Sequence, residues 1–470
     1  MKKGGHFLNG RWVDGQNTDA HTVSSASFST RLYSASEATA TEIEFATESA
    51  ARALDSWSRT PHVERAAAIE RIKKATLPRI DEIARTWATE AGMPIEDAKA
   101  ATEALPIYAM DSYARIARDF EYEQTLGTSV LLHEPAGLAV GITPWNYPFS
   151  QVAIKAVTAI AAGCSIIVKP SELAPGCAYI FAEIIESADI PDGVFNLITG
   201  SGRVGQALVS HPKTRVISFT GSTATGTKIL HAAANGIKRC TLELGGKSPL
   251  LILPDSDIEQ AISSGMASCF RNNGQTCTAL TRFLVPREDV GRAAEMAAQI
   301  SEASVVGDPL DPATTLGPLV SRKQWERVQE LIATGIAEGA DLITGGGGEP
   351  SGFQGGNYVQ PTVFANVDAD STLAQEEVFG PVLAIISYDS VDHAVELANN
   401  SNYGLAAAVW GPHEEETAHI ARRISAGVIS VNGAGFNAEA PYGGLRRSGL
   451  GHELGEYGFR EYLDVKVLNA

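Results

Sequence analysis

The segment Ile166-Ile167-Val168-Lys169, followed by Pro170-Ser171-Glu172, decides the fold class of this chain. Its β-branched run predicts a buried strand that ends at the proline. Similar short runs alternate with helical segments along the chain, as is typical of a parallel, doubly wound sheet in an α/β protein. The first expected strands are 138–142, 165–169, 194–198, 216–220 and 241–244.

A second α/β domain and an N-terminal helical region are also expected. Residues 35–120 show apolar side chains near helical periodicity, with Gly92 and Pro94 as a stop signal. A second strand series, separated by helical or glycine-rich connections, indicates the second domain. Its expected strands are 249–253, 282–285, 382–387, 406–410 and 427–431.

Composition limits the possible partners. The chain has 470 residues, of which 44% are hydrophobic, so two or three domains with large cores are expected. A net charge of −18 argues against nucleic-acid or anionic-membrane binding, which leaves small molecules as the expected partners. The N-terminus lacks the form of a secretory signal, and the longest apolar stretch, 153–168, is too short to span a bilayer. We therefore expect a cytoplasmic protein.

One cysteine has chemically suggestive neighbours. Cys277 follows the polar, glycine-containing segment 271–276, and Glu243 lies upstream in Leu242-Glu243-Leu244-Gly245-Gly246-Lys247. A thiol nucleophile and a carboxylate base together suit acyl-thioester chemistry. The five cysteines show no disulfide or zinc-site spacing, which predicts a reducing compartment and no metal. The four expected to be structural are Cys164, Cys177, Cys240 and Cys269.

Two glycine-rich segments compete for a nucleotide. Gly200-Ser201-Gly202-Arg203-Val204-Gly205 matches GxGxxG, but no acidic residue follows at the usual spacing. Phe219-Thr220-Gly221-Ser222 instead runs from a strand into small residues that open a helix, which suits a phosphate. At the end of the strand 165–169, Glu172 could accept ribose hydroxyls and repel a 2′-phosphate, so NAD is favoured, with NADP possible because Lys169 is adjacent.

Seven segments together resemble the signatures of the aldehyde dehydrogenase superfamily, in the family's order from about Phe7 to the C-terminus. This resemblance implies a Rossmann-like parallel-sheet cofactor domain, an α/β catalytic domain and a small β oligomerisation element. One departure is Arg446, where the family usually has lysine. The matching segments are 144–148 (PWNYP), 169–172 (KPSE), 219–222 (FTGS), 243–247 (ELGGK), 274–277 (GQTC), 376–381 (EEVFGP) and 441–444 (PYGG).

The resemblance also implies catalytic roles. Cys277 would attack the aldehyde, and Asn146 with the Cys277 backbone N–H would bind the oxyanion, each donor contributing roughly 3 to 4 kcal/mol. Glu243 would activate the water that hydrolyses the thioester. One alternative is transfer of the acyl group to coenzyme A, in a branch that lacks this glutamate. Another is a catalytically silent nucleotide-binding or structural protein.

By the same resemblance, further residues would bind cofactor and substrate. Ile154 stands where relatives acting on succinate semialdehyde carry arginine, so a neutral aliphatic or aromatic aldehyde is expected. The expected cofactor residues are Lys169, Glu172, Gly221, Ser222, Glu377, Phe379 and Trp145. The expected substrate residues are Tyr147, Gln151, Ile154, Thr276, Thr278, Phe436 and Tyr442.

The domain boundaries follow from the order of these segments. We predict an NAD-binding domain over 1–116 and 136–244, and a catalytic domain over 245–440. An oligomerisation element is expected over 117–135 and 463–470, because exposed strand edges need partners. A homodimer or homotetramer is implied by analogy with the family.

Overall fold

The first large sheet lies in the half of the molecule that contains the N-terminus. The computed structural model describes residues 4–16 and 20–469, so parts of the predicted ranges 1–116 and 463–470, including the basic residues 2–3, lie outside it. Within the described residues, the sheet has the order β19-β11-β10-β7-β8-β9-β1-β2. Its strands are β1 (His6–Leu8), β2 (Arg11–Val13), β7 (Leu138–Ile142), β8 (Ile166–Lys169), β9 (Phe195–Leu197), β10 (Thr214–Thr220), β11 (Arg239–Glu243) and β19 (Gly449–Leu450).

Helices cover both faces of this sheet because its strands are apolar on both sides. Ile166 and Val168 of β8 join one core cluster, and the alternate residue Ile167 joins the other. The helices that contribute to these cores, and those that link them, are α1 (Ala40–Trp57), α2 (His62–Thr76), α3 (Ile80–Ala91), α4 (Ile95–Glu103), α5 (Leu105–Asp119), α6 (Pro148–Ala162), α7 (Gly176–Ser187), α8 (Gly202–Ser210) and α9 (Thr223–Ala234), with the short turn η1 (Leu77–Arg79).

The helical expectation for residues 35–120 is confirmed by α1 to α5. Helix α3 ends at Gly92, whose φ of 84° lies in the left-handed region that glycine adopts without penalty. The predicted stop signal is therefore located correctly.

The second large sheet has the order β14-β15-β16-β13-β12-β17-β18 within the described residues. Leu284 of β13 joins one core cluster, and its neighbours Phe283 and Val285 join the other. The strands are β12 (Ser248–Ile252), β13 (Leu280–Pro286), β14 (Asp341–Thr344), β15 (Thr362–Ala365), β16 (Val382–Tyr388), β17 (Ala406–Trp410) and β18 (Val428–Val431). The helices are α10 (Ile258–Phe270), α11 (Val290–Glu302), α12 (Arg322–Ala337), α13 (Thr372–Gln375), α14 (Val391–Asn399) and α15 (Glu414–Ala421), with the turn η3 (Arg287–Asp289).

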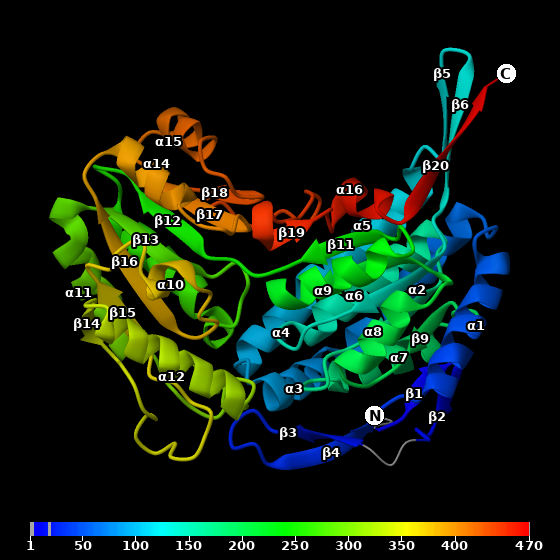
Figure 1. The fold of residues 1–470 in the computed structure, drawn as a ribbon, viewed down its shortest axis with the longest axis horizontal. Coiled ribbons are helices and arrows are strands. Elements are labelled where there is room, and N and C mark those ends of the chain that lie inside the picture. Colours follow the sequence, from blue (N-terminus) through cyan, green and yellow to red (C-terminus); the bar gives the residue numbers. More distant parts are fainter. Residues whose placement is uncertain (1–3, 17–19, 470) are drawn as a thin grey trace.

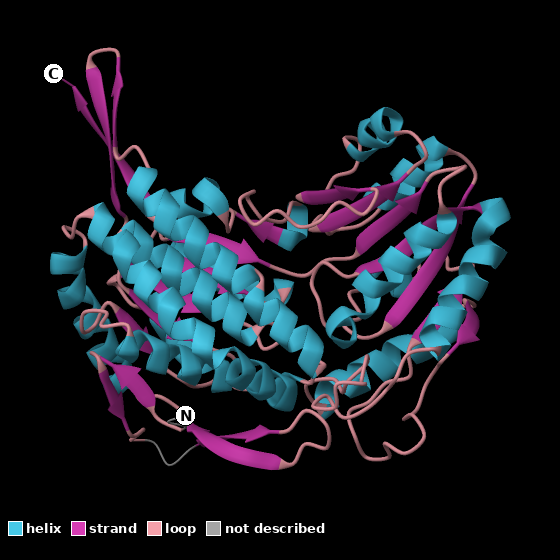
Figure 2. Ribbon diagram, turned by 180° about the vertical axis from the view of Figure 1, so that it is seen from behind, coloured by secondary structure: helices cyan, strands magenta, loops and turns pink. Residues whose placement is uncertain are grey.

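Two small antiparallel sheets complete the fold. A three-stranded sheet, in the order β20-β6-β5, projects from the body and carries the C-terminal strand (Figures 1 and 2). The other small sheet is a hairpin of β3 and β4 below the first large sheet in Figure 1. The strands are β3 (Ala20–Ser24), β4 (Arg31–Ser36), β5 (Glu123–Leu126), β6 (Ser129–Pro135) and β20 (Leu463–Asn469), and helix α16 (Gly455–Arg460) and turn η4 (Arg446–Ser448) precede β20.

The predicted α/β fold class is confirmed, with one correction to the strand directions. Most strands of both large sheets are parallel, but β1 pairs antiparallel with both β9 and the edge strand β2, and the edge strands β19 and β14 also pair antiparallel. These strands, at or next to the sheet edges, are two to four residues long, too short to show a periodic pattern. Strand β19 also comes from a stretch that our domain division leaves unassigned, and that division stays a prediction.

The chain crosses from one large sheet to the other between β11 and β12 (Figure 1). Strand β11 ends where this crossing begins, and the parallel strands β8 and β10 end at the same carboxyl edge of the first sheet. Open α/β sheets bind ligands at this edge. Within the described residues, no helix is both long and apolar enough to cross a lipid bilayer.

The packing of the core in the first half can be tested with two variants of α2. Ile72 of α2 is fully buried, whereas Val63 on the same helix is 53% exposed. We expect Ile72→Ala to lower the free energy of unfolding by about 2–5 kcal/mol because it leaves a cavity. The matched Val63→Ala change should cost less than about 1 kcal/mol in the same denaturant titration. Equal losses for the two variants would contradict this packing.

Candidate active site

The loop that carries Cys277 has an unusual backbone. Cys277 follows the turn η2 (Arg271–Gly274) and precedes β13. Asn272 and Asn273 have φ of 51° and 61°, in the left-handed region that asparagine tolerates better than most residues. Gly274 has φ of 75°, and a Cβ there would overlap the backbone just before β16. Glycine is therefore needed here for both conformation and space.

Two buried side chains tie this loop to both halves of the molecule. Asn273 donates from Nδ2 to the carbonyl oxygens of Gly92 at 2.8 Å and Pro318 at 2.9 Å. Gln275 accepts from the Val320 backbone N–H at 2.9 Å through Oε1. Because buried backbone groups need partners, these bonds fix the loop against the end of α3 and against the segment before α12.

Asn146 lies against the same loop. It sits between β7 and α6, and the Trp87 indole donates to its carbonyl oxygen at 3.0 Å. Its Nδ2 donates to the carbonyl oxygen of Gln275 at 3.0 Å. The amide nitrogen carries a second proton, which stays available for another acceptor next to Cys277.

The Cys277 thiol is half-buried, and its Sγ lies 3.4 Å from the Tyr442 hydroxyl. Burial raises the pKa of the thiol to about 12, the Tyr442 hydrogen bond lowers it, and the Glu377 and Glu243 carboxyls raise it. Asn272 is buried and donates to the Asn146 carbonyl oxygen at 3.0 Å, whereas Arg271 at the start of this polar segment is exposed.

Glu243 ends β11 and is only 3% exposed. Neither of its carboxylate oxygens has a hydrogen-bond partner within the described residues. Burial raises its pKa well above the usual value, the Glu453 carboxyl raises it further, and Lys155 opposes this rise. A Cβ built on Gly443, the residue after Tyr442, would lie 3.4 Å from Glu243 Oε1. Glu243 thus faces the segment that contacts the thiol.

Lys155 and Glu453 form a buried ion pair behind Glu243. Lys155 Nζ also donates to Ser218 Oγ at 3.0 Å. The sequence analysis did not assign this pair to the site. Its only signal is a single lysine within the apolar run 153–168, which demands a buried counter-charge but does not say which one.

The other expected cofactor residues, Lys169, Glu172, Gly221 and Ser222, lie at the carboxyl edge of the first sheet. Lys169 is buried at the end of β8, donates to the Gly200 carbonyl oxygen at 2.6 Å and lies 3.7 Å from Glu172. Ser222 caps helix α9 and is exposed, and a Cβ on Gly221 would press into the Phe219 ring at 2.5 Å. The first turn of α9 therefore presents backbone N–H groups beside small residues.

Three of the expected cofactor residues, Glu377, Phe379 and Trp145, lie where the two halves meet. Glu377 accepts from the Gly246 N–H at 3.0 Å, and burial raises its pKa to about 7. The rings of Phe379 and Trp145 meet edge to face with centroids 5.4 Å apart. A Cβ on Gly245 would lie 2.5 Å from the Glu377 carboxylate, so the Gly245-Gly246 cradle that holds this side chain depends on glycine.

The weak GxGxxG match does not present a free helix terminus. Ser201, the N-cap of α8, donates to the buried Glu37 carboxylate from its backbone N–H at 2.6 Å and from Oγ at 2.8 Å. The carboxylate thus occupies the position at which a phosphate would accept these bonds.

The expected substrate residues differ in their surroundings. Tyr147 bonds Thr276 at 3.1 Å between hydroxyls, and the Phe436 and Tyr442 rings meet with centroids 6.1 Å apart. Ile154, by contrast, is 2% exposed within the core, where it borders a small cavity with Lys155. The remaining members are Gln151, which accepts from Thr220, and the half-buried Thr278.

Residues 12–468 match the model of the aldehyde dehydrogenase family. The chain belongs to the aldehyde dehydrogenase family. The predicted family and enzyme class are therefore confirmed. The roles of individual site residues stay predictions.

Similar proteins cover almost the whole chain. A 3-succinoylsemialdehyde-pyridine dehydrogenase from Pseudomonas sp is 40% identical over 98% of this chain and 97% of its own length. The structure of a mutant aldehyde dehydrogenase C from Pseudomonas syringae, with NAD+ and octanal, has a TM-score of 0.97 at 39% identity and covers 99% of this chain and 96% of that one. An NADP-dependent enzyme from Escherichia coli has a TM-score of 0.95 at 33% identity, covering 99% and 98%.

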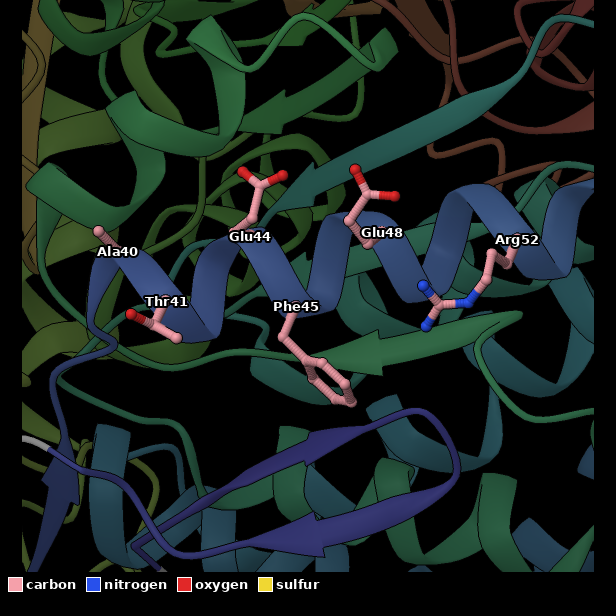
Figure 3. A pocket seen from close by; sticks show the side chains of 6 residues that line it. All are labelled: Ala40, Thr41, Glu44, Phe45, Glu48 and Arg52. Atoms are coloured by element: carbon pink, nitrogen blue, oxygen red, sulfur yellow. The ribbon is translucent and has the colours of Figure 1, made fainter.

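A shallow hollow lies on α1, outside the aldehyde dehydrogenase site (Figure 3). Phe45 projects from one side of the helix there, and Glu44 and Glu48 project from the other. None of its lining residues belongs to the catalytic, cofactor or substrate sets. They are Ala40, Thr41, Glu44, Phe45, Glu48 and Arg52.

The loop anchors can be tested by removing one amide. Asn273→Ala loses the bonds to Gly92 and Pro318 and the one accepted from the Gly317 N–H at 2.6 Å. We expect about 2–5 kcal/mol less stability because the backbone groups stay buried without partners. Denaturant unfolding measures the change, and the exposed Asn235→Ala serves as the matched control. Similar stability in the two variants would contradict the anchoring role.

Proposed function

We propose that the protein oxidises an aldehyde to a carboxylic acid with NAD, through a thioester on Cys277 that Glu243 helps to hydrolyse. The observation that supports it best is that an amide contacts the loop of a half-buried thiol, and an unpartnered buried carboxylate lies beside the segment that contacts the thiol itself. Asn146 bonds the residue two before Cys277, and Glu243 faces the Tyr442 segment that contacts the thiol.

The first half of the reaction uses Cys277 and Asn146. After the thiol has lost its proton to water, the sulfur forms a bond to the carbonyl carbon, and the C=O π pair moves to oxygen. The second Nδ2 proton of Asn146 and the Cys277 backbone N–H stabilise this oxyanion. When the carbonyl forms again, hydride leaves the carbon with its electron pair, and a thioester remains on Cys277.

Bound NAD supplies the acceptor for that hydride. The residues present fit such a cofactor on two observations. The N-terminus of α9 presents backbone N–H groups beside Gly221 and the exposed Ser222, which suits a pyrophosphate. The Gly245-Gly246 cradle leaves space that any Cβ would fill, and it holds Glu377 where a ribose could be bound.

The second half of the reaction uses Glu243. Its carboxylate takes a proton from water as the water oxygen attacks the thioester carbon, the C–S bond breaks, and the acid leaves. The raised pKa of Glu243 makes the carboxylate a stronger base than usual. Hydrolysis should accelerate as pH rises through this raised pKa, since only the deprotonated form can accept the proton.

The proposed cofactor preference and substrate class follow from the same side chains. Glu172, beside Lys169, would repel a 2′-phosphate, which favours NAD, while the NADP-dependent relative keeps NADP possible. A neutral aliphatic or aromatic aldehyde fits the aromatic pair Phe436 and Tyr442, and the octanal complex of the relative supports it.

We also propose a homodimer or homotetramer. Strand β20 carries the exposed apolar residues Val465, Val467 and Leu468, and β5 carries the exposed Leu126. Water-exposed apolar side chains on a projecting sheet favour burial against a second copy. The predicted oligomerisation element over 117–135 and 463–470 would supply that contact.

The chemistry can be tested with octanal and NAD. Cys277→Ser should lower steady-state NADH formation about a thousandfold or more, because the nucleophile is lost. Glu243→Gln should give an NADH burst equal to the subunits present, then a slow phase, because the thioester persists. Cys240→Ser, at a half-buried thiol outside the site, is the matched control and should keep full activity.

Three outcomes would contradict parts of this proposal. Full turnover by Cys277→Ser would remove the thiol from the mechanism. An unchanged steady rate without a burst in Glu243→Gln would remove the base. Formation of acyl-coenzyme A in place of the acid, when coenzyme A is added, would support the acylating alternative.

The cofactor preference can be tested at Glu172. We expect Glu172→Gln to raise kcat/KM for NADP relative to NAD about tenfold, because a like charge facing the 2′-phosphate is removed. Steady-state kinetics with both cofactors measure the ratio. Glu396→Gln, at an exposed position of α14, should leave it unchanged. An unchanged ratio in Glu172→Gln would show that this carboxylate does not face the ribose.

A further inference from the structure

Tyr442 is held in place by its own backbone. Its N–H donates to the Glu453 carbonyl oxygen at 2.7 Å, and the Glu453 N–H donates back at 2.7 Å, which makes an isolated antiparallel bridge. A Cβ on the next residue, Gly443, would lie 2.6 Å from the Gly451 carbonyl oxygen, so the two chain segments approach closely. The position of the phenol ring therefore follows from backbone contacts that a side-chain change leaves intact.

The hydroxyl of Tyr442 points to the sulfur of Cys277. The two atoms are 3.4 Å apart, within hydrogen-bond range for sulfur. No other hydrogen-bond partner of this hydroxyl is found in the part of the chain that the structure describes. The contact is therefore the one polar interaction that the phenol oxygen makes there, and it falls on the reacting atom.

The charges around this contact determine which group donates. Burial raises the pKa of Tyr442 well above its usual value, and the nearby Cys277, Glu243 and Glu453 raise it further. Burial therefore favours the neutral phenol, which carries a proton that it can donate. The carboxyls that face the thiol, Glu243 from β11 and Glu377 from the loop before β16, disfavour a thiolate. A neutral O–H donor counteracts them without adding a charge.

We propose that Tyr442 is a catalytic residue, whose hydroxyl donates a hydrogen bond to the Cys277 thiolate and so stabilises the nucleophile before it attacks. This role rests on the proposed function of Cys277. It goes beyond the lining of a substrate tunnel, because the contact involves the sulfur and exists without substrate. The phenol keeps its proton throughout. Its hydrogen bond to the sulfur weakens as the sulfur shares its electron pair with the carbonyl carbon.

The test removes a single oxygen atom. In Tyr442→Phe the rate of Cys277 alkylation by iodoacetamide, followed on the Cys277 peptide by mass spectrometry, should fall about tenfold or more at a given pH, because hydrogen bonds to charged groups are the strong ones. Its pH dependence should move to higher pH. With octanal and NAD, the rate constant of the NADH burst should fall by a larger factor than the factor by which KM rises.

Two controls separate this role from a structural one. Tyr457→Phe removes a hydroxyl from a 62% exposed tyrosine of α16 and should leave alkylation and turnover unchanged. Replacement of Tyr442 by 3-fluorotyrosine keeps the shape but makes the O–H a stronger donor. It should move the alkylation profile to lower pH, opposite to Tyr442→Phe, and it keeps the idea testable if that variant folds poorly.

The contrary result is equally specific. An alkylation profile in Tyr442→Phe identical to that of the parent, with only KM for octanal changed, would overturn the proposal and leave Tyr442 as a tunnel residue. This outcome is distinct from a failure of the proposed function, which would appear as full turnover by Cys277→Ser while alkylation of the parent enzyme stays normal.

Discussion

The left-handed backbone from Asn272 to Gly274 is the constraint on which the aldehyde dehydrogenase site depends. The turn is short, buried and conformationally costly, so it persists only where its surroundings hold it. Asn273 supplies that support from both sides, through the end of α3 and the segment at Pro318. Because these segments belong to different halves of the fold, the Cys277 position is set by how the halves meet.

Burial has opposite effects on the two reacting groups. It strengthens Glu243 as a base, since a carboxylate removed from water holds a proton more tightly. It also works against the Cys277 thiolate, for the same reason. A site that is dry enough for the base must therefore stabilise the sulfur by hydrogen bonds, and the amide, backbone and phenol donors around Cys277 are neutral groups suited to that task.

Local pattern was sufficient for much of this fold. The β-branched runs that end at Lys169 and Thr220 predicted interior strands, and the motifs around Glu243 and Cys277 predicted the family.

The edge strands were missed because a strand as short as β19 has too few residues to show a period. The Lys155–Glu453 pair was missed for another reason: its members are 298 residues apart, and sequence shows that a buried lysine needs a partner without showing which. Polarity alone does not show exposure, since Asn272 is polar and yet buried.

The hydrogen bonds from Ser201, the N-cap of α8, to the Glu37 carboxylate affect how glycine motifs are interpreted. The first turn of any helix attracts negative charge, and here an acidic side chain from a distant part of the chain satisfies that demand internally. Of the two glycine-rich turns that the sequence offers for a nucleotide, the one before α8 therefore already holds an anion. Whether a glycine-rich turn can recruit a dinucleotide is decided by the rest of the fold, through the presence or absence of a resident competitor.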